Sequence, residues 1–99
     1  MVLIHVSVKT KEDMANVFEH KLSEIVTDAR KTKGCVKYEW YRVPDSATRY
    51  IIFGEFDSEA NFGDYLNSDI VKRIGKELIP LLEGKPEFKH YQANILKSS

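Results

Sequence analysis

Hydrophobic and polar residues alternate along four stretches of the chain, Val2–Val8, Cys35–Val43, Tyr50–Phe56 and Glu87–Leu96. Successive side chains of a β-strand point to opposite faces of a sheet, so this period of two residues predicts four strands. The second and third stretches flank the turn Pro44-Asp45-Ser46-Ala47. Its proline presets φ, and its aspartate and serine can bond their own backbone, so we expect an antiparallel hairpin here.

Between the first two stretches, apolar residues recur at helical spacing. The segment follows Thr10-Lys11-Glu12-Asp13, where the threonine can cap free backbone amides and the acidic residues suit the positive end of a helix. It continues to near Gly34, which can adopt the left-handed conformation that ends helices. The apolar face of this predicted helix is formed by Met14, Val17, Phe18, Leu22, Ile25, Val26 and Ala29.

A further helical segment follows the hairpin. Asp57 or Ser58 can cap its start, and Asn67-Ser68-Asp69 predicts a break with a second cap. Pro80 cannot continue the helix without cost, so we expect the helix to end there. The part after the break carries the apolar residues Ile70, Val71, Ile74, Leu78 and Ile79.

The predicted elements follow the order βαββαβ within a single domain of residues 1–99. Two such units fold as an α+β, ferredoxin-like arrangement, in which a four-stranded antiparallel sheet has its helices on one face. In this arrangement the first strand is central and the last strand is an edge.

Several of the predicted strands carry apolar groups on both faces. Alternation puts Val36, Tyr38 and Trp40 on one face of their strand and Tyr41 on the other. One face of the sheet would lack helices, and a chain of this size is too small to leave so much apolar surface exposed. We therefore expect a homodimer in which two sheets pack face to face.

Charge, apolar run length and cysteine content indicate which partners and which cellular compartment to expect. The chain has 15 basic and 15 acidic residues and no block of like charges, so nothing favours nucleic acid or an anionic membrane. No apolar run approaches the roughly 20 residues that span a bilayer, and the first residues do not resemble a signal peptide. A single cysteine agrees with a reducing compartment, so we expect a cytoplasmic protein.

Three segments resemble the antibiotic biosynthesis monooxygenase family of dimeric α/β-barrel domains. The segment Arg30-Lys31-Thr32-Lys33-Gly34-Cys35-Val36-Lys37-Tyr38 resembles the family's arginine, glycine, cysteine and downstream aromatic residue. The segment Phe53-Gly54-Glu55-Phe56-Asp57-Ser58-Glu59-Ala60 resembles its strand end and capped helix, and Asn67-Ser68-Asp69 resembles the polar break after that helix. The resemblance implies the ferredoxin-like fold, a dimer and a cofactor-independent oxygenase of quinol or hydroxy-aromatic substrates.

The chain also departs from the family pattern. Phe56 stands where the family usually has tryptophan, and Tyr65 stands where many members have histidine. The haem-degrading branch uses asparagine, tryptophan and histidine at the positions of Ser7, Tyr65 and Gly75. Glycine has no side chain to ligate iron, so we expect no haem, no metal and no other cofactor.

Three ionisable residues are candidate general bases. His5 and His90 lie on the first and last predicted strands, and histidine titrates near working pH. Glu55 interrupts an apolar strand, where a carboxylate must be paired or its pKa rises. Each of these residues could instead have a purely structural role. The two histidines could form local hydrogen bonds, and Glu55 could form an ion pair with an arginine, for which the candidates are Arg30, Arg42 and Arg49.

Tyr38, Phe56 and Tyr65 are the candidate substrate-binding residues. Aromatic side chains can line a pocket for a flat, apolar metabolite, although on strands and helices they commonly serve as core. Three functions therefore remain open. The first is a cofactor-independent monooxygenase. The second is a non-catalytic dimer that binds a small aromatic or apolar metabolite or regulates a partner, and the third is an isomerase or lyase that needs one acid or base.

Overall fold

The computed structural model describes residues 1–98, so Ser99, the last residue of the expected domain, lies outside the described residues. The described chain forms four strands and three α-helices in the order βαββααβ, with α2 and α3 at the place of the second predicted helix. Their bounds are β1 Val2–Lys9, α1 Ala15–Ala29, β2 Cys35–Arg42, β3 Arg49–Phe56, α2 Glu59–Leu66, α3 Asp69–Arg73 and β4 Glu87–Gln92.

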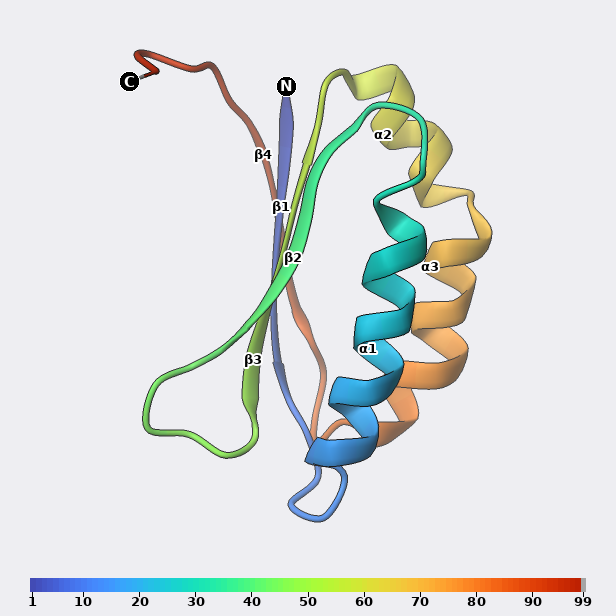
Figure 1. Cartoon of the computed structure of the whole chain (residues 1–99), viewed down its shortest axis with the longest axis vertical. Helices are drawn as coiled ribbons and strands as arrows, with labels where there is room; N and C mark the ends of the chain where they lie inside the picture. Colours follow the sequence, from blue (N-terminus) through green and yellow to red (C-terminus); the bar gives the residue numbers. More distant parts are fainter. Residues whose placement is uncertain (99) are drawn as a thin grey trace.

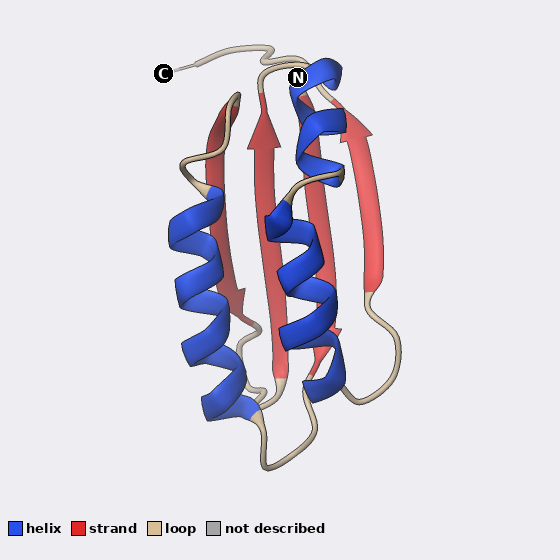
Figure 2. Ribbon diagram, turned by 90° about the vertical axis from the view of Figure 1, so that its right-hand side faces the viewer, coloured by secondary structure: helices blue, strands red, loops and turns tan. Residues whose placement is uncertain are grey.

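The strands form one antiparallel sheet in the order β2-β3-β1-β4, which puts β1 in the centre and β4 at an edge. All three helices lie against the same face of the sheet, as Figure 1 shows with the sheet seen edge-on. Seen from the helix side, α1 covers one half of the sheet, and α2 and α3 cover the other half (Figure 2). The predicted α+β, ferredoxin-like fold is therefore confirmed.

The hydrophobic core lies between the helices and the sheet. Strand alternation supplies the sheet side of this core, because every second residue of β1 and β3 points towards the helices. Five predicted apolar positions of α1 supply the helix side: Phe18, Leu22, Ile25, Val26 and Ala29 are buried. Val17, which we expected on the same face, is 43% exposed.

Helix α1 is shorter than expected at both ends. Thr10 does not cap it; this residue pairs with Leu82 at the end of β1 and is fully buried. The helix starts after Met14 without a side-chain cap and ends at Ala29. Gly34 has a φ of +80° in the loop that follows, and a Cβ there would lie 2.5 Å from the Asn61 side chain. Gly34 therefore serves the turn into β2 rather than the helix end.

A β-bulge corrects the predicted faces of β2. The register with β3 shifts between Cys35 and Lys37, so Val36 is the extra residue of the bulge and is 58% exposed. It does not share the buried face with Tyr38, because an inserted residue interrupts the alternation. Strand β4 is also shorter than expected: it ends at Gln92 rather than Leu96.

The segment after the hairpin follows the predicted pattern with one addition. Ser58 caps α2, because its Oγ accepts the Asn61 backbone N–H at 3.1 Å, and Ser68 occupies the N-cap position of α3. Helix α3 then passes into a π-helical turn at Ile74–Leu78 and a 3-10 turn at Ile79–Leu81. Pro80 lies in the 3-10 turn, where its missing N–H costs no helical hydrogen bond.

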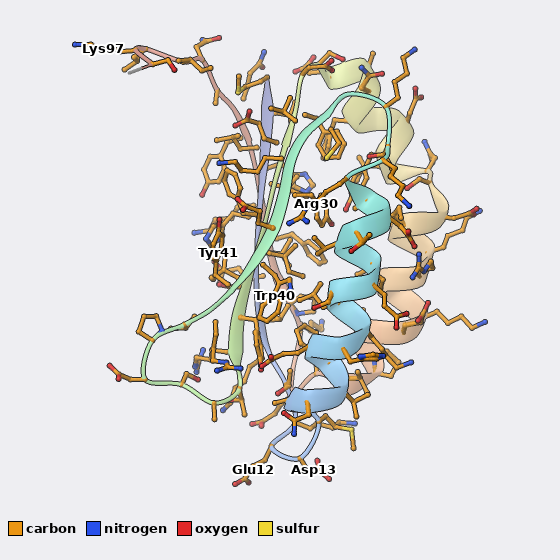
Figure 3. The ribbon with its side chains drawn as sticks, viewed as in Figure 1. Glu12, Asp13, Arg30, Trp40, Tyr41 and Lys97 are labelled. Carbon is orange, nitrogen blue, oxygen red and sulfur yellow. The ribbon has the colours of Figure 1, made fainter. Side chains whose placement is uncertain are left out.

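The other face of the sheet has no helix over it. Trp40 points towards the helices and Tyr41 points away from them (Figure 3). Three cross-strand rows cover this helix-free face: Lys37–Glu55–Leu3–Tyr91, Glu39–Phe53–His5–Lys89 and Tyr41–Ile51–Ser7–Glu87. Five of these twelve residues are apolar or aromatic and seven are polar or charged, so the helix-free face is mixed rather than wholly apolar. Within residues 1–98, no helix has the length and apolar character needed to cross a membrane.

Candidate functional site

An apolar cavity of about 320 Å³ lies between the sheet and the helices. This volume falls within the range of small-molecule sites, which begins near roughly 300 Å³. Its walls come from β1, β2, β3 and β4, from α1, α2 and α3, and from the turns before β4. The lining contains no lysine, arginine, aspartate or glutamate, and its polar side chains are those of Tyr38, Tyr65 and His90.

The π-helical turn contributes Ile74, Gly75 and Leu78 to the cavity wall. Gly75 lies in the turn and lines the cavity, and a Cβ built on it would meet no atom within 4 Å. A π-helical turn inserts an extra residue into a helix and is frequent at functional sites. Gly75 is itself exposed, so it lies where the cavity meets the protein surface.

Tyr38 of β2 and Tyr65 of α2 meet at the cavity wall. Their hydroxyl oxygens are 2.6 Å apart, a hydrogen bond in which either hydroxyl can donate. Both side chains are almost completely buried, at 1% and 6% exposure. Burial raises the pKa of both phenols, because it disfavours the phenolate. The pair is therefore uncharged at neutral pH and offers hydroxyl groups rather than an anion.

Phe56 supports this pair from behind. It is fully buried, and its ring centroid lies 4.7 Å from that of Tyr65 and 5.8 Å from that of Phe62, which in turn lies 6.1 Å from that of Tyr65. Phe56 is not among the residues that line the cavity. The structure thus brings together the three predicted substrate-binding residues, but only Tyr38 and Tyr65 reach the cavity.

His90 of β4 is the one predicted base that lines the cavity. It lies opposite Ile4 in the sheet, and its imidazole meets the ring of Phe62 edge-on with centroids 5.0 Å apart. Because β4 is an edge strand, the His90 side chain is exposed and also borders a shallow surface hollow. His90 is therefore placed between the cavity and solvent, where an imidazole can exchange a proton with water.

His5 and Glu55 lie on the helix-free face of the sheet. His5 is opposite Phe53 and Lys89, and Glu55 is opposite Leu3 and Lys37. The sheet separates both side chains from the cavity, since residues 4 and 54 point to the helix side. Their expected role as general bases remains a prediction that this arrangement does not test.

Two of the three arginines expected near Glu55 have other partners, and the third, Arg49, lies opposite Lys9 at the other end of β3. Arg30 donates its Nε–H to the Tyr38 carbonyl at 2.8 Å, and Arg42 forms an ion pair with Glu19. Across residues 1–98, no ion pair to Glu55 is present. Glu55 is half-buried on the strand.

The sequence did not single out two important wall residues. Phe88 lies two residues before His90 on β4 and lines the cavity with it, because alternate residues of a strand share a face. Gly75 was considered only as a position without an iron ligand, although a glycine inside a helical pattern ahead of Pro80 can signal an irregular turn. No local pattern shows that the turn would open onto a cavity.

The described part of the chain contains no cluster of three or more histidine, cysteine, aspartate or glutamate side chains that could hold a metal ion. The donor set of the cavity is two phenols and one imidazole, which suits an organic ligand.

Fold and cavity together define an α+β domain that can hold a small apolar molecule between its sheet and helices. A model of the antibiotic biosynthesis monooxygenase family matches residues 1–94, and the chain belongs to that family. The predicted family is thereby confirmed. No curated protein matches the sequence.

Solved structures share the fold at low sequence identity. A proposed antibiotic biosynthesis monooxygenase from Deinococcus radiodurans superposes with a TM-score of 0.90 and 18% identity, over 100% of this chain and 98% of the other. A second one, from Nitrosomonas europaea, gives 0.86 and 11% identity over 94% and 98%. A Mycobacterium tuberculosis protein gives 0.86 and 17% identity over 99% and 98%. Identities this low establish the fold alone.

Proposed function

We propose that this protein is a cofactor-independent monooxygenase that acts on a small quinol or other hydroxy-aromatic molecule held in the cavity. The observation that carries the proposal is the lining: apolar walls interrupted by the Tyr38–Tyr65 hydroxyl pair and the His90 imidazole. Family membership adds independent support for oxygenase chemistry.

The proposed reaction begins with a proton transfer. The hydroxyl proton of the substrate moves to the His90 imidazole, which leaves an electron-rich anion. The anion donates electrons from a ring carbon to molecular oxygen, and a carbon–oxygen bond forms to give a hydroperoxide. That carbon then loses its hydrogen as a proton and the O–O bond breaks, which produces a carbonyl and water. In sum, one hydroxy-aromatic and one O₂ give one quinone and one water, so the substrate supplies all the electrons.

The cavity suits these steps in three respects. Apolar walls exclude water, which protects a reactive anion from side reactions and strengthens hydrogen bonds to it. The hydroxyl hydrogen of the Tyr38–Tyr65 pair that is not used in their mutual bond can be donated to the anion, and hydrogen bonds to a charged oxygen are about twice as strong as neutral ones. His90, at the solvent side, can return its proton to water.

Oxygen uptake tests the proposal. The wild-type protein should consume O₂ with a reduced quinol or 1-naphthol without added flavin, haem or metal. His90→Ala should lower the rate by about 10²–10⁴-fold, the usual loss for a positioned base. His20→Ala is the matched control, because His20 is exposed on α1 and pairs only with Glu24. Uptake by His90→Ala at the wild-type rate would remove His90 from the mechanism.

The same assay covers the other candidate bases. His5→Ala and Glu55→Gln should leave uptake near wild type if the reaction takes place in the cavity, since both residues lie on the far face of the sheet. A large loss in either variant, with His90→Ala unaffected, would move the chemistry to the helix-free face.

A non-catalytic ligand-binding module is the second candidate function. The nearly continuous apolar lining favours it, because binding a small apolar metabolite requires burial and no base. Tight binding of an aromatic ligand with no oxygen uptake by the wild-type protein would establish this function instead.

A further inference from the structure

The Tyr38–Tyr65 pair holds more hydrogen-bond donors than it uses. Each phenol carries one O–H donor and can also accept. The two hydroxyls form a single bond with each other, and within residues 1–98 neither makes another side-chain or backbone hydrogen bond. One hydroxyl hydrogen of the pair is therefore left over in a buried place. Buried donors are almost always satisfied, so this hydrogen needs an acceptor from the cavity.

The two tyrosines differ in their access to that acceptor. Tyr38 is the more deeply buried, at 1% exposure, with its backbone carbonyl bound by Arg30. Tyr65 is 6% exposed and belongs to α2, next to Leu66, which also lines the cavity. If Tyr38 donates to Tyr65, the spare hydrogen is on Tyr65. The Tyr65 hydroxyl, which then accepts a hydrogen bond from Tyr38, is a stronger donor than a phenol that accepts none, because hydrogen bonds in a chain polarise one another.

The remaining lining restricts the charge of the occupant. A carboxylate or phosphate in the cavity would lose its hydration shell and meet no lysine or arginine among the lining residues. Burial also keeps both phenols protonated, so they present donors and no negative charge. An uncharged ligand with one hydrogen-bond-accepting oxygen satisfies the spare donor without an unpaired charge.

We infer that the Tyr65 hydroxyl, accepting a hydrogen bond from Tyr38, is the oxygen-recognition group of the cavity and selects uncharged hydroxy-aromatic ligands over anionic ones. This inference rests on the proposed function, since it names the feature of the substrate that the same cavity recognises. Tyr65 and Tyr38 have different parts in it: Tyr65 touches the ligand oxygen, and Tyr38 is a positioning residue that acts through Tyr65.

Three probes of similar shape separate these contributions. We would measure binding of 1-naphthol, naphthalene and 1-naphthoate by equilibrium dialysis under nitrogen, where no oxygenation takes place. The wild-type protein should bind 1-naphthol about tenfold more tightly than naphthalene, which corresponds to one well-made hydrogen bond. It should bind 1-naphthoate more weakly than either. Equal affinity for 1-naphthol and naphthalene, or tight binding of 1-naphthoate, would overturn the inference.

Two variants make the role of each tyrosine testable. Tyr65→Phe and Tyr38→Phe both remove the same 2.6 Å bond, so both should lose similar stability in urea. Only Tyr65→Phe should bind 1-naphthol no better than naphthalene; Tyr38→Phe should keep part of the preference. Tyr41→Phe is the control, because Tyr41 lies on the helix-free face with its hydroxyl on Glu39. A larger loss of preference in Tyr38→Phe would overturn the assignment to Tyr65.

Anaerobic binding and oxygen uptake report separately on this inference and on the proposed function. Binding under nitrogen needs neither O₂ nor a base, so a preference for 1-naphthol that depends on Tyr65 supports the inference even if oxygen uptake is absent. If the protein consumes oxygen but does not prefer 1-naphthol to naphthalene, the proposed monooxygenase function stands and the recognition role of Tyr65 is overturned.

Discussion

Gly54 of β3 lies opposite Ile4 of β1, and a Cβ atom on Gly54 would come within 2.7 Å of the Ile4 Cγ1. The same atom would lie 3.2 Å from Cδ2 of Tyr38. Ile4 and Tyr38 both form part of the cavity wall. A glycine at this position therefore allows the central strand and the tyrosine to pack closely where the cavity is built.

Gly54→Ala should destabilise the protein. The added methyl group overlaps Ile4 and must displace it, and overpacking of a core typically costs about 1–3 kcal/mol. Urea unfolding followed by circular dichroism measures the change. Gly63→Ala is the control: Gly63 lies inside α2 and its Cβ would meet nothing within 4 Å, so alanine should stabilise the helix by about 0.5–1 kcal/mol. Equal stability of Gly54→Ala and wild type would contradict the close packing.

Gly75→Leu should block the cavity without unfolding the chain. The new side chain has open space at its Cβ and starts from a position that lines the cavity, so it should occupy volume that a ligand needs. We expect affinity for 1-naphthol to fall at least tenfold while the unfolding midpoint in urea stays at or above that of wild type, because glycine is a poor helix former.

Gly63→Leu is the matched control for that experiment. Gly63 has equally open space at its Cβ but is not a cavity residue. This variant should bind 1-naphthol as the wild type does. Unchanged binding by Gly75→Leu would show that ligands do not use the space beside the π-helical turn.

The ionised Glu19 side chain should make the free energy of unfolding depend on pH in the acid range. The hydrogen bond from Tyr50 and then the one from Arg42 hold the pKa of this carboxyl below its usual value of 4.5, against the opposing effect of burial. A lowered pKa in the folded state means that the stabilisation is complete above the usual pKa and is lost as the pH falls through the folded pKa. The stability difference between wild type and Glu19→Gln should thus be largest near neutral pH and shrink below about pH 4.5.

Urea unfolding of both proteins across the acid range tests this dependence. Glu12→Gln provides the control, because Glu12 is exposed in the loop before α1 and forms no ion pair within the described residues. Its difference from wild type should stay small at every pH. A wild-type advantage over Glu19→Gln that grows as the pH falls would contradict a lowered pKa for Glu19 in the folded protein.

The helix-free face should pair with a second copy of the chain. Ile51 and Phe53 are half-buried there, and Tyr41 and Tyr91 are 49% and 48% exposed. Light scattering at micromolar concentration should give the mass of a dimer for the wild type and of a monomer for Phe53→Lys, because a lysine on each face would place like charges in the interface. Val17→Lys, which places the same charge on the outer side of α1, should remain dimeric. A monomeric wild type would contradict the prediction.

The periodic patterns of the sequence were enough to establish the order of elements and most of the core. The alternation along β1 and β3 predicted which residues are buried, because a strand has only two faces. The same rule failed at Val36. A bulge inserts a residue into one strand, and its position depends on the pairing with β3, which local sequence does not reveal. The predicted start of α1 was also wrong, because Thr10 bridges to Leu82, far away in the chain.

The sequence by itself determined the family, the α+β fold and the residue types available for chemistry. Only the tertiary structure decided which of them share a site. His5 and His90 looked equivalent as strand histidines, yet His90 faces the cavity and His5 faces away from it. Tyr38 and Tyr65 are 27 positions apart, and packing of α2 against the sheet brings their hydroxyls to 2.6 Å. The physical reason is that strand period and helix spacing specify the face of a residue within its element, whereas a site depends on how faces of distant elements meet.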